Sequence, residues 1–326
     1  MLARACRAAF LAVLGAIQLH AAPAVAVAQQ WPQGPVRFIL PLGPGSGADI
    51  GARLFGERLA KAWGHPVVIE NRPGGDAFLA ITTVTQANDD HVLLFGPAGA
   101  FTAHPLQHAK LPYDPADLVA IARVTNTIVS VTTTASLAVK TLPEFVALVR
   151  GEPGKYNFAS VTGLHDFLVR SFLKSNGLDL VRVPYRDGVQ AANDAGEGRI
   201  HFLSAGFAIV RPQLEAGKLK HLAVTTSRRV PQLPDLATVR ELGAPELEFD
   251  GLVGLLGPRA MTAATRERIA ADIAAIARDP EIVAKLEATG QAVNPGGPAE
   301  FAAAIAAQRA VALEAGRNLG VQPGQQ

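Results

Sequence analysis

A short stretch rich in glycine, LGPGSGAD at residues 42–49, is the part of this chain best suited to chemistry. An apolar run, VRFIL at residues 36–40, precedes it, and apolar residues recur at helical spacing in residues 50–63. This order predicts a buried strand, a tight turn and the start of a helix. Backbone N–H groups and the helix dipole make such a helix start a site for an anion. The alternative, an ordinary turn whose glycines only permit tight geometry, stays open at this point.

Asp49 ends this turn and is expected to cap the helix, because a carboxylate accepts the free N–H groups of a first helical turn. A ligand carboxylate would then meet the backbone N–H groups of Gly45, Ser46, Gly47 and Ala48. Asp49 itself is expected to shape the loop without touching the ligand, since two like charges in contact repel each other.

The same turn formally matches the dinucleotide-binding pattern G-x-G-x-x-G/A, and Glu70 ends the next apolar run near the place of a ribose-binding acid. An export signal would keep the protein away from the nicotinamide pool. The rest of the chain also offers no persuasive hydride-transfer constellation. A secreted dinucleotide-binding oxidoreductase is therefore the less favoured alternative.

Other catalytic patterns are sparse. The chain has no Walker lysine after the glycine-rich turn, no H-E-x-x-H and no G-x-S-x-G. His104 and His108 are separated by Pro105, which argues against a shared helix face. His165 beside Asp166 could form an acid–base pair, although a cap and its neighbour at a helix start is the favoured interpretation. We therefore expect a binding protein and not an enzyme, with no catalytic residue, no metal site and no cofactor.

Residues 1–28 have the features of a secretory signal peptide. Arg4 and Arg7 provide the positive end, residues 10–19 the apolar run, and Ala26-Val27-Ala28 a small-residue cleavage site. That apolar run is shorter than a membrane-spanning helix requires, and no later apolar run is long enough to span a membrane. We expect a protein secreted into the periplasm without stable membrane insertion.

The remaining composition narrows the possible partners. Cys6, the only cysteine, lies inside the signal, so no disulfide is expected. Without Arg4 and Arg7, the 30 Lys and Arg fall to 28, equal to the 28 Asp and Glu. Few aromatics and no basic patch argue against nucleic acid. A chain with 49% hydrophobic residues can bury a large core, and a monomer is expected.

Strand and helix patterns alternate along the chain, which indicates an α/β fold with parallel strands. A second strand–loop–helix unit, at residues 156–174, repeats the plan of the first. We predict two lobes joined by two crossings, the first lobe from residues 29–127 plus 252–326 and the second from 128–251. The part after the second crossing reads as entirely helical. Ligands of open α/β sheets bind at the carboxyl ends of the strands.

Ten stretches together resemble one family in order and spacing. They are WP and PVRFI within 31–39, PLGPGSGAD at 41–49, WGHPVVIENRPG at 63–74, LPYDP at 111–115, YNFAS at 156–160, VPY at 183–185, AGKL at 216–219, LAVT at 222–225, LPD with TV within 233–239, and GLLGP at 254–258. The family is that of the periplasmic substrate-binding receptors of tripartite tricarboxylate transporters, also called Bug-type proteins.

The resemblance implies a two-lobed, type II-like binding protein that closes on a small carboxylate in the cleft between its lobes. Two facing loops would hold that carboxylate mainly by backbone N–H groups, here residues 42–49 and 160–163. The family's first loop usually has an aromatic at Leu42 and a glycine at Ser46, and its second loop is usually longer. The ligand-binding residues expected on this basis are Leu42, Gly45, Ser46, Gly47, Ala48, Asp49, Ala98, Ser160, Val161, Thr162, Gly163, His165, Tyr185 and Ser204.

The resemblance also implies a role and partners. We expect an extracytoplasmic solute-binding protein that captures a small carboxylate for uptake and delivers it to the membrane subunits of a tripartite transporter. A sensory or accessory receptor that feeds a signalling partner would use the same pocket, and this alternative stays open.

Overall fold

The computed structural model describes residues 31–160 and 163–321. The predicted signal peptide at residues 1–28 lies outside the described residues, as do Val161 and Thr162 of the second predicted loop. From Gly34 onward the chain forms one unit built on two β-sheets.

The first sheet has six strands in the order β11-β4-β10-β3-β1-β2. They are β1 Val36–Leu40, β2 Val67–Asn71, β3 Val92–Pro97, β4 Leu118–Thr127, β10 Gly251–Pro258 and β11 Gln291–Gly296. The early strands β1, β2 and β3 pair in parallel, whereas β10 is antiparallel to both β3 and β4. The parallel part therefore comes from the alternating strand–helix pattern at the start of the chain, as predicted.

The second sheet has five strands in the order β7-β6-β8-β5-β9. They are β5 Val129–Thr134, β6 Tyr156–Ser160, β7 Leu180–Arg182, β8 Phe202–Gly206 and β9 Leu219–Val224. The chain enters this sheet after Thr127 and returns to the first at Gly251, so two crossings join the two lobes, as predicted for this fold class. The assignment of residues 29–127 and 252–326 to one lobe and 128–251 to the other stays a prediction.

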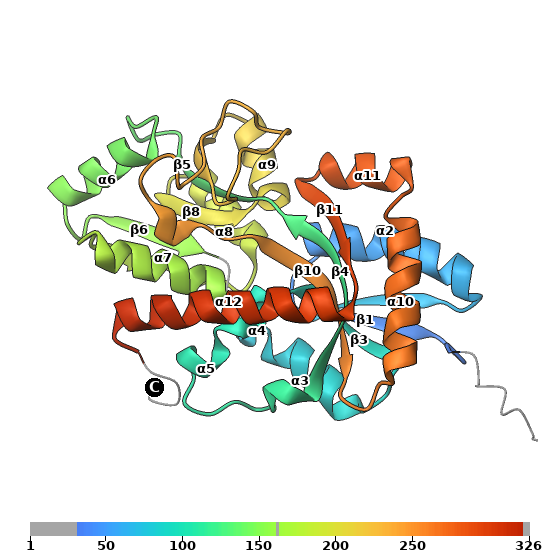
Figure 1. The fold of residues 1–326 in the computed structure, drawn as a ribbon. Coiled ribbons are helices and arrows are strands. Elements are labelled where there is room, and N and C mark those ends of the chain that lie inside the picture. The colour runs from blue at the N-terminus through green and yellow to red at the C-terminus, as the bar shows by residue number, and fades with distance from the viewer. Residues whose placement is uncertain (1–30, 161–162, 322–326) are drawn as a thin grey trace, which may run out of the picture. The chain divides into compact units, whose positions relative to one another are not determined.

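Helices connect the strands of both sheets (Figure 1). The α-helices are α2 Gly47–Trp63, α3 Phe78–Ala87, α4 Gly99–Thr102, α5 His104–Gln107, α6 Leu142–Gly151, α7 Leu164–Ser175, α8 Gly188–Gly196, α9 Phe207–Glu215, α10 Ala263–Ile276, α11 Pro280–Glu287 and α12 Pro298–Leu319. Short 3-10 turns occur at η1 Gly75–Ala77, η2 Pro115–Asp117 and η3 Pro245–Leu247.

Side chains on the two faces of β1 belong to different layers. Ile39 packs in one hydrophobic cluster with Ile81 of α3 and Phe301 of α12. Phe38 stacks on Phe95, with ring centroids 5.6 Å apart. Burying a large apolar side chain fully contributes roughly 1.5–3 kcal/mol, so this two-sided burial explains why β1 reads as continuously apolar.

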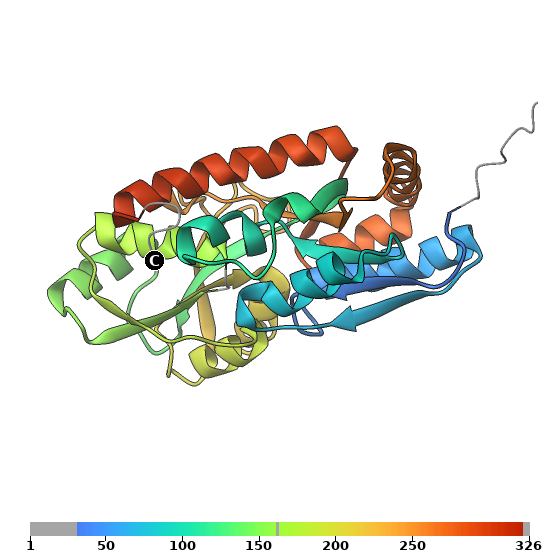
Figure 2. The same cartoon turned by 90° about the horizontal axis from the view of Figure 1, so that it is seen from below.

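Helix α12 packs against elements of both lobes. It packs against β4 of the first sheet and against α7, which follows β6 of the second. Figures 1 and 2 both show it running past β4 to α7. Near its C-terminus, Ala312 and Ala315 share a cluster with Phe167 and Leu168 of α7, so small side chains permit the close helix contact.

The expectation of an entirely helical end is wrong in one place. Strand β11 lies between α11 and α12 and pairs antiparallel with β4 at the edge of the first sheet. Its sequence, QAVNPG, is polar and contains a proline, so local pattern does not mark it as a strand. The pairing with β4 decides its conformation.

Candidate functional site

The start of α2 is organised by Ser46 and not by Asp49. Ser46 is the N-cap residue, with extended backbone angles, and its Oγ accepts the N–H of Asp49 at 3.3 Å. The helix therefore begins at Gly47, and the predicted capping role of Asp49 is corrected. A serine reaches the third N–H of the helix with no strain, and this frees the Asp49 carboxylate for other partners.

The Asp49 carboxylate instead ties the loop to its surroundings. It accepts the Gly45 N–H at 3.0 Å, the guanidinium of Arg53 at 2.9 Å and 3.1 Å, and the amide of Asn71 at 2.9 Å. Burial pushes the pKa of Asp49 upward, but the hydrogen bonds from Arg53, Gly45 and Asn71 outweigh it and hold the pKa below its usual value. Asp49 is thus an ionised residue that shapes the loop, as the sequence predicts.

Two of the four backbone N–H groups predicted to meet a ligand already have partners. Gly45 donates to Asp49, and Ser46 donates to the Gly43 carbonyl at 3.4 Å. Those of Gly47 and Ala48 lie in the first turn of α2, where helix geometry supplies no carbonyl partner. These two N–H groups are therefore the ones available to an anion.

The second predicted loop has an equivalent acid. Asp166 is the third residue of α7. It accepts hydrogen bonds from Ser160 Oγ at 2.7 Å and Arg182 Nε at 2.9 Å, and it forms an ion pair with Arg170, with Nε 3.1 Å away. The hydroxyl of Ser160, one of the predicted ligand-binding residues, thus donates to Asp166. A Cβ on Gly163 would lie 2.2 Å from the carbonyl oxygen of Gly99, so only glycine fits where this loop passes the first lobe.

His165, the second residue of α7, is buried, with 3% of its surface exposed. Its Nε2 lies 2.8 Å from Ser204 Oγ, and its ring stacks on Phe249 with centroids 5.5 Å apart and planes inclined by 7°. Its Nδ1 is buried with no hydrogen-bond partner among the described residues. Burial lowers the pKa of His165 to about 4, so the ring is neutral near pH 7.

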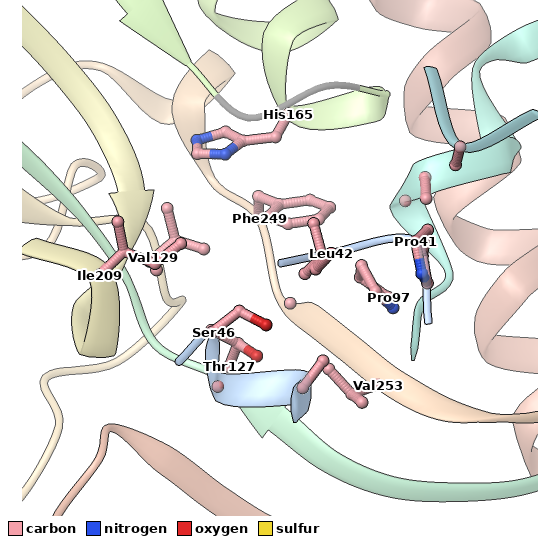
Figure 3. A pocket seen from close by; sticks show the side chains of 17 residues that line it. Pro41, Leu42, Ser46, Pro97, Thr127, Val129, His165, Ile209, Phe249 and Val253 are labelled. Atoms are coloured by element: carbon pink, nitrogen blue, oxygen red, sulfur yellow. The ribbon is translucent and has the colours of Figure 1, made fainter. Parts of the chain in front are cut away.

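A cavity of about 60 Å³ lies between the starts of α2 and α7. Figure 3 shows His165 and Phe249 on one side of it and Ser46 and Thr127 on the opposite side. Its walls are mainly apolar and come from both lobes. They are formed by Pro41, Leu42, Ser46, Gly47, Ala48, Ala77, Pro97, Gly99, Ala100, Thr127, Val129, His165, Gly206, Ile209, Phe249, Gly251 and Val253.

A smaller pocket of about 30 Å³ adjoins this cavity and shares four residues with it, namely Pro41, Leu42, Ser46 and Ile209. Ser160, Tyr185, Arg186 and Asp187 also line it. The Tyr185 hydroxyl donates to Asp194 at 2.7 Å, and burial together with this bond raises the pKa of Tyr185 to about 12. The Tyr185 hydroxyl is thus already hydrogen-bonded to a residue of its own lobe.

The structure gathers five of the predicted site residues around the larger cavity and two more around the smaller pocket. The larger cavity has Leu42, Ser46, Gly47, Ala48 and His165, and the smaller pocket adds Ser160 and Tyr185. The other predicted site residues that the structure describes line neither the larger cavity nor the smaller pocket; they are Gly45, Asp49, Ala98, Gly163 and Ser204. Val161 and Thr162 lie outside the described residues.

Gln291, which lies beside the site, could not be predicted from its local sequence pattern. Gln291 of β11 is fully buried, and its Oε1 accepts the hydroxyls of Thr125 and Thr127 at 2.9 Å and 3.1 Å. Its Nε2 has no hydrogen-bond partner among the described residues. A Cβ on Gly47 would lie 1.9 Å from this Nε2, so Gly47 is required for the amide to lie against the start of α2. The wall residues Val129, Ile209 and Phe249 were equally absent from the predicted set.

Two α/β lobes joined by two crossings, with a cavity between the helix starts, define a periplasmic binding protein of the two-lobed class. Residues 51–310 match the family described as "Tripartite tricarboxylate transporter family receptor", and the chain belongs to this family. The resemblance seen in the sequence is thereby confirmed.

Curated relatives and solved structures are similar to this chain over most of its length. A UPF0065 protein of Bordetella bronchiseptica is 28% identical over 299 residues, 91% of this chain and 89% of the relative. The structure described as "R. palustris Rpa4515 with adipate" has a TM-score of 0.83 at 26% identity and covers 90% of this chain and 100% of that one. MatC from Rhodopseudomonas palustris, described with bound malate, has a TM-score of 0.80 at 24% identity, with coverages of 88% and 100%.

No helix in residues 31–160 and 163–321 combines the length and the apolar character needed to cross a bilayer.

Proposed function

We propose that this protein is an extracytoplasmic receptor that captures a small carboxylate in the cavity between its lobes. The observation that carries the proposal is the start of α2, where Ser46, Gly47 and Ala48 line the cavity at the positive end of a helix of 17 residues. The adipate named with the related structure at 26% identity supports the same broad ligand class.

The chemistry of the loop suits an anion. Gly47 and Ala48 supply two backbone N–H donors. The Ser46 oxygen accepts the Asp49 N–H, so its own O–H proton is free to donate into the cavity. The charge of Asp49 is compensated by Arg53, which reduces its repulsion of an incoming carboxylate.

Capture would couple to closure of the lobes. A ligand that contacts α2 from one lobe and α7 from the other binds the closed state better, and so shifts the open–closed equilibrium. Membrane subunits of a tripartite system would receive the loaded receptor. A sensory role for the same pocket is the alternative, and a pull-down from membranes with and without ligand separates the two.

A Ser–His pair raises the question of catalysis. His165 Nε2 and Ser204 Oγ are 2.8 Å apart, a geometry that hydrolases use. Ser204 is fully buried and does not line the cavity, so a substrate there would not reach its oxygen. We therefore assign the pair to the positioning of His165 and keep the function as binding.

A thermal-shift screen of mono- and dicarboxylates, followed by calorimetry, tests the proposal. A ligand at 100 times its Kd stabilises the folded state by about 2.7 kcal/mol, which is readily seen as a higher Tm. At least one small carboxylate is expected to do this. A panel in which uncharged amides of the same acids raise the Tm equally would contradict the anion site.

A further inference from the structure

We propose that His165 is a specificity-determining residue of the cavity: Ser204 fixes its ring as the Nδ1–H tautomer, and this N–H donates to a ligand oxygen outside the carboxylate held at α2. Acids that carry such an oxygen, of which oxo acids are the uncharged case, should therefore bind better than alkyl acids of the same length. This inference rests on the proposed function and goes beyond it by naming a second group that the site recognises.

The hydrogen bond between Ser204 and His165 decides which ring nitrogen carries the proton. Ser204 Oγ is fully buried, and His165 Nε2, 2.8 Å away, is its one hydrogen-bond partner among the described residues. If the serine O–H donates to Nε2, the serine proton is satisfied and the ring proton lies on Nδ1. If Nε2–H donates instead, the serine proton and Nδ1 are both left without a partner. Because an unsatisfied buried polar group is costly, the first arrangement is favoured.

The orientation of the ring directs Nδ1 toward the ligand. His165 lines the cavity, whereas Ser204, which contacts Nε2, does not. Figure 3 shows one ring nitrogen of His165 on the side that faces the space toward Ser46. Since Nε2 faces Ser204, this nitrogen is Nδ1. Stacking on Phe249, with planes inclined by 7°, holds the ring in this orientation.

The Nδ1–H group of His165 finds no acceptor in the protein. Nδ1 is buried and has no hydrogen-bond partner within residues 31–160 and 163–321. Burial lowers the pKa of His165 to about 4, so near pH 7 the ring is neutral and carries this single N–H. A ligand that supplies an acceptor satisfies the donor, whereas an alkyl ligand leaves it buried and unpaired. A site of this kind discriminates strongly against the analogue that lacks the acceptor.

The acceptor is a ligand oxygen outside the carboxylate assigned to α2. Figure 3 shows His165 on one side of the cavity and Ser46 and Thr127 on the opposite side. A carboxylate held by the N–H groups of Gly47 and Ala48 therefore leaves Nδ1–H to another part of the ligand. A ketone oxygen or an oxygen of a second carboxylate can accept this bond, and neither needs a cation beside it.

Calorimetry of the purified protein with matched acids near neutral pH tests the ligand side. The comparisons are α-ketobutyrate and acetoacetate with butyrate, and levulinate with valerate, so the ketone oxygen adds no charge and its distance from the carboxylate varies. At least one oxo acid is expected to bind about tenfold more tightly than its alkyl partner. No advantage for any oxo acid would overturn this inference, and the proposed function would stand if any carboxylate binds. If a wider carboxylate panel also fails to bind, both fail together.

Three variants, each checked by melting curves, locate the effect. His165→Phe keeps a flat ring beside Phe249 without the donor, and Ser204→Ala removes the O–H that fixes the tautomer, so both should lower the ratio of oxo-acid to alkyl-acid affinity. Ser130→Ala is the matched control, because the buried Ser130 Oγ lies 2.8 Å from Nδ1 of His221 and lines neither pocket. It should keep the parental ratio. A parental ratio in His165→Phe, or equal losses in the two serine variants, would overturn the inference.

Nitrogen NMR of isotope-labelled histidines measures the tautomer itself, in a parent protein that needs no substitution in the site. Comparison with the spectrum of His165→Gln assigns the signal of His165. Near pH 7 this signal should show the proton on Nδ1, and it should shift when an oxo acid binds. Ser204→Ala should mix the two tautomers. A proton on Nε2 in the parent would overturn the inference whatever the affinities are.

Discussion

Asp49 and Asp166 occupy the same position of two equivalent helices, the third residue of α2 and of α7. Each forms an ion pair with an arginine four residues later, Arg53 at 2.9 Å and Arg170 at 3.1 Å. Each also accepts a side chain from the neighbouring parallel strand, Asn71 of β2 and Arg182 of β7.

The same arrangement of contacts therefore holds the loop before α2 in one lobe and the loop before α7 in the other. In both, a buried carboxylate is compensated within its own lobe and does not face the cavity. The second residues of the two helices, Ala48 and His165, both line it, together with Gly47 at the start of α2. The lobes thus differ in what they present: backbone donors from α2 and a neutral imidazole from α7.

Ser46→Ala should reduce both stability and ligand affinity. Loss of an N-cap hydroxyl costs about 1 kcal/mol of folding free energy. Loss of the O–H donor to a carboxylate should weaken binding by about tenfold, since a charged hydrogen bond contributes about 1.5 kcal/mol or more and 1.4 kcal/mol is one decade. Urea denaturation and calorimetry with the best carboxylate measure the two effects.

Thr262→Ala is the matched control for that variant. Thr262 caps α10 by accepting the Thr265 N–H at 3.1 Å and does not line the cavity. It should lose similar stability and keep the parental affinity. Equal affinity losses in both variants would show that Ser46 acts only through the fold.

Ala48→Pro removes one of the two N–H groups assigned to the ligand, in the first helical turn where proline is tolerated. Binding should weaken by about tenfold to a hundredfold, the effect of losing 1.5–3 kcal/mol. Ala48→Gly keeps the N–H group and should bind much more tightly than the proline variant. If melting curves show both variants folded and calorimetry gives equal affinities, the carboxylate lies elsewhere.

Gln291→Glu should make carboxylate binding depend on pH. The isosteric carboxyl would lie against Gly47, where its negative charge opposes that of the ligand. Burial raises the pKa of such a carboxyl, so affinity should recover as the pH falls and the group becomes neutral. Calorimetry across several pH values measures the effect.

Asn294→Asp adds a carboxylate on the same strand, at a side chain that bonds Arg123 and does not line the cavity. Its affinity should follow the parent at every pH. A uniform loss of affinity in Gln291→Glu, independent of pH, would mean that Gln291 serves packing alone.

Stability should rise with pH between about 4 and about 6.5, the ordinary pKa of histidine. Burial lowers the pKa of His165 and of His104 to about 4 each. In this window the unfolded chain binds more protons than the folded one, so acid favours unfolding. Each group contributes a slope of up to about 1.4 kcal/mol per pH unit.

His165→Gln and His104→Gln should each flatten part of this slope, and the double variant should flatten both parts. Urea denaturation at several pH values gives the slopes. An unchanged slope in the double variant would show that other groups govern acid unfolding.

Much of the fold was predictable because its determinants are local. The continuous apolar run of β1, the glycines of the following turn and the helical spacing after it specify strand, loop and helix without distant contacts. The same pattern at β6 and α7 indicated the second lobe. The identity of the N-cap was missed because Ser46 and Asp49 both suit that role, and only the position of Arg53 and Asn71 around Asp49 decides between them.

The cavity, in contrast, depends on contacts that no local pattern encodes. Gln291 meets Gly47 only because β11 pairs with β4 at the sheet edge, and Phe249 stacks on His165 only because the second crossing passes the start of α7. Sequence alone therefore determined the place of the proposed anion site, through backbone donors at a helix start. The tertiary structure decided which side chains surround that proposed site, because side chains from both lobes converge only once strand order and register are set.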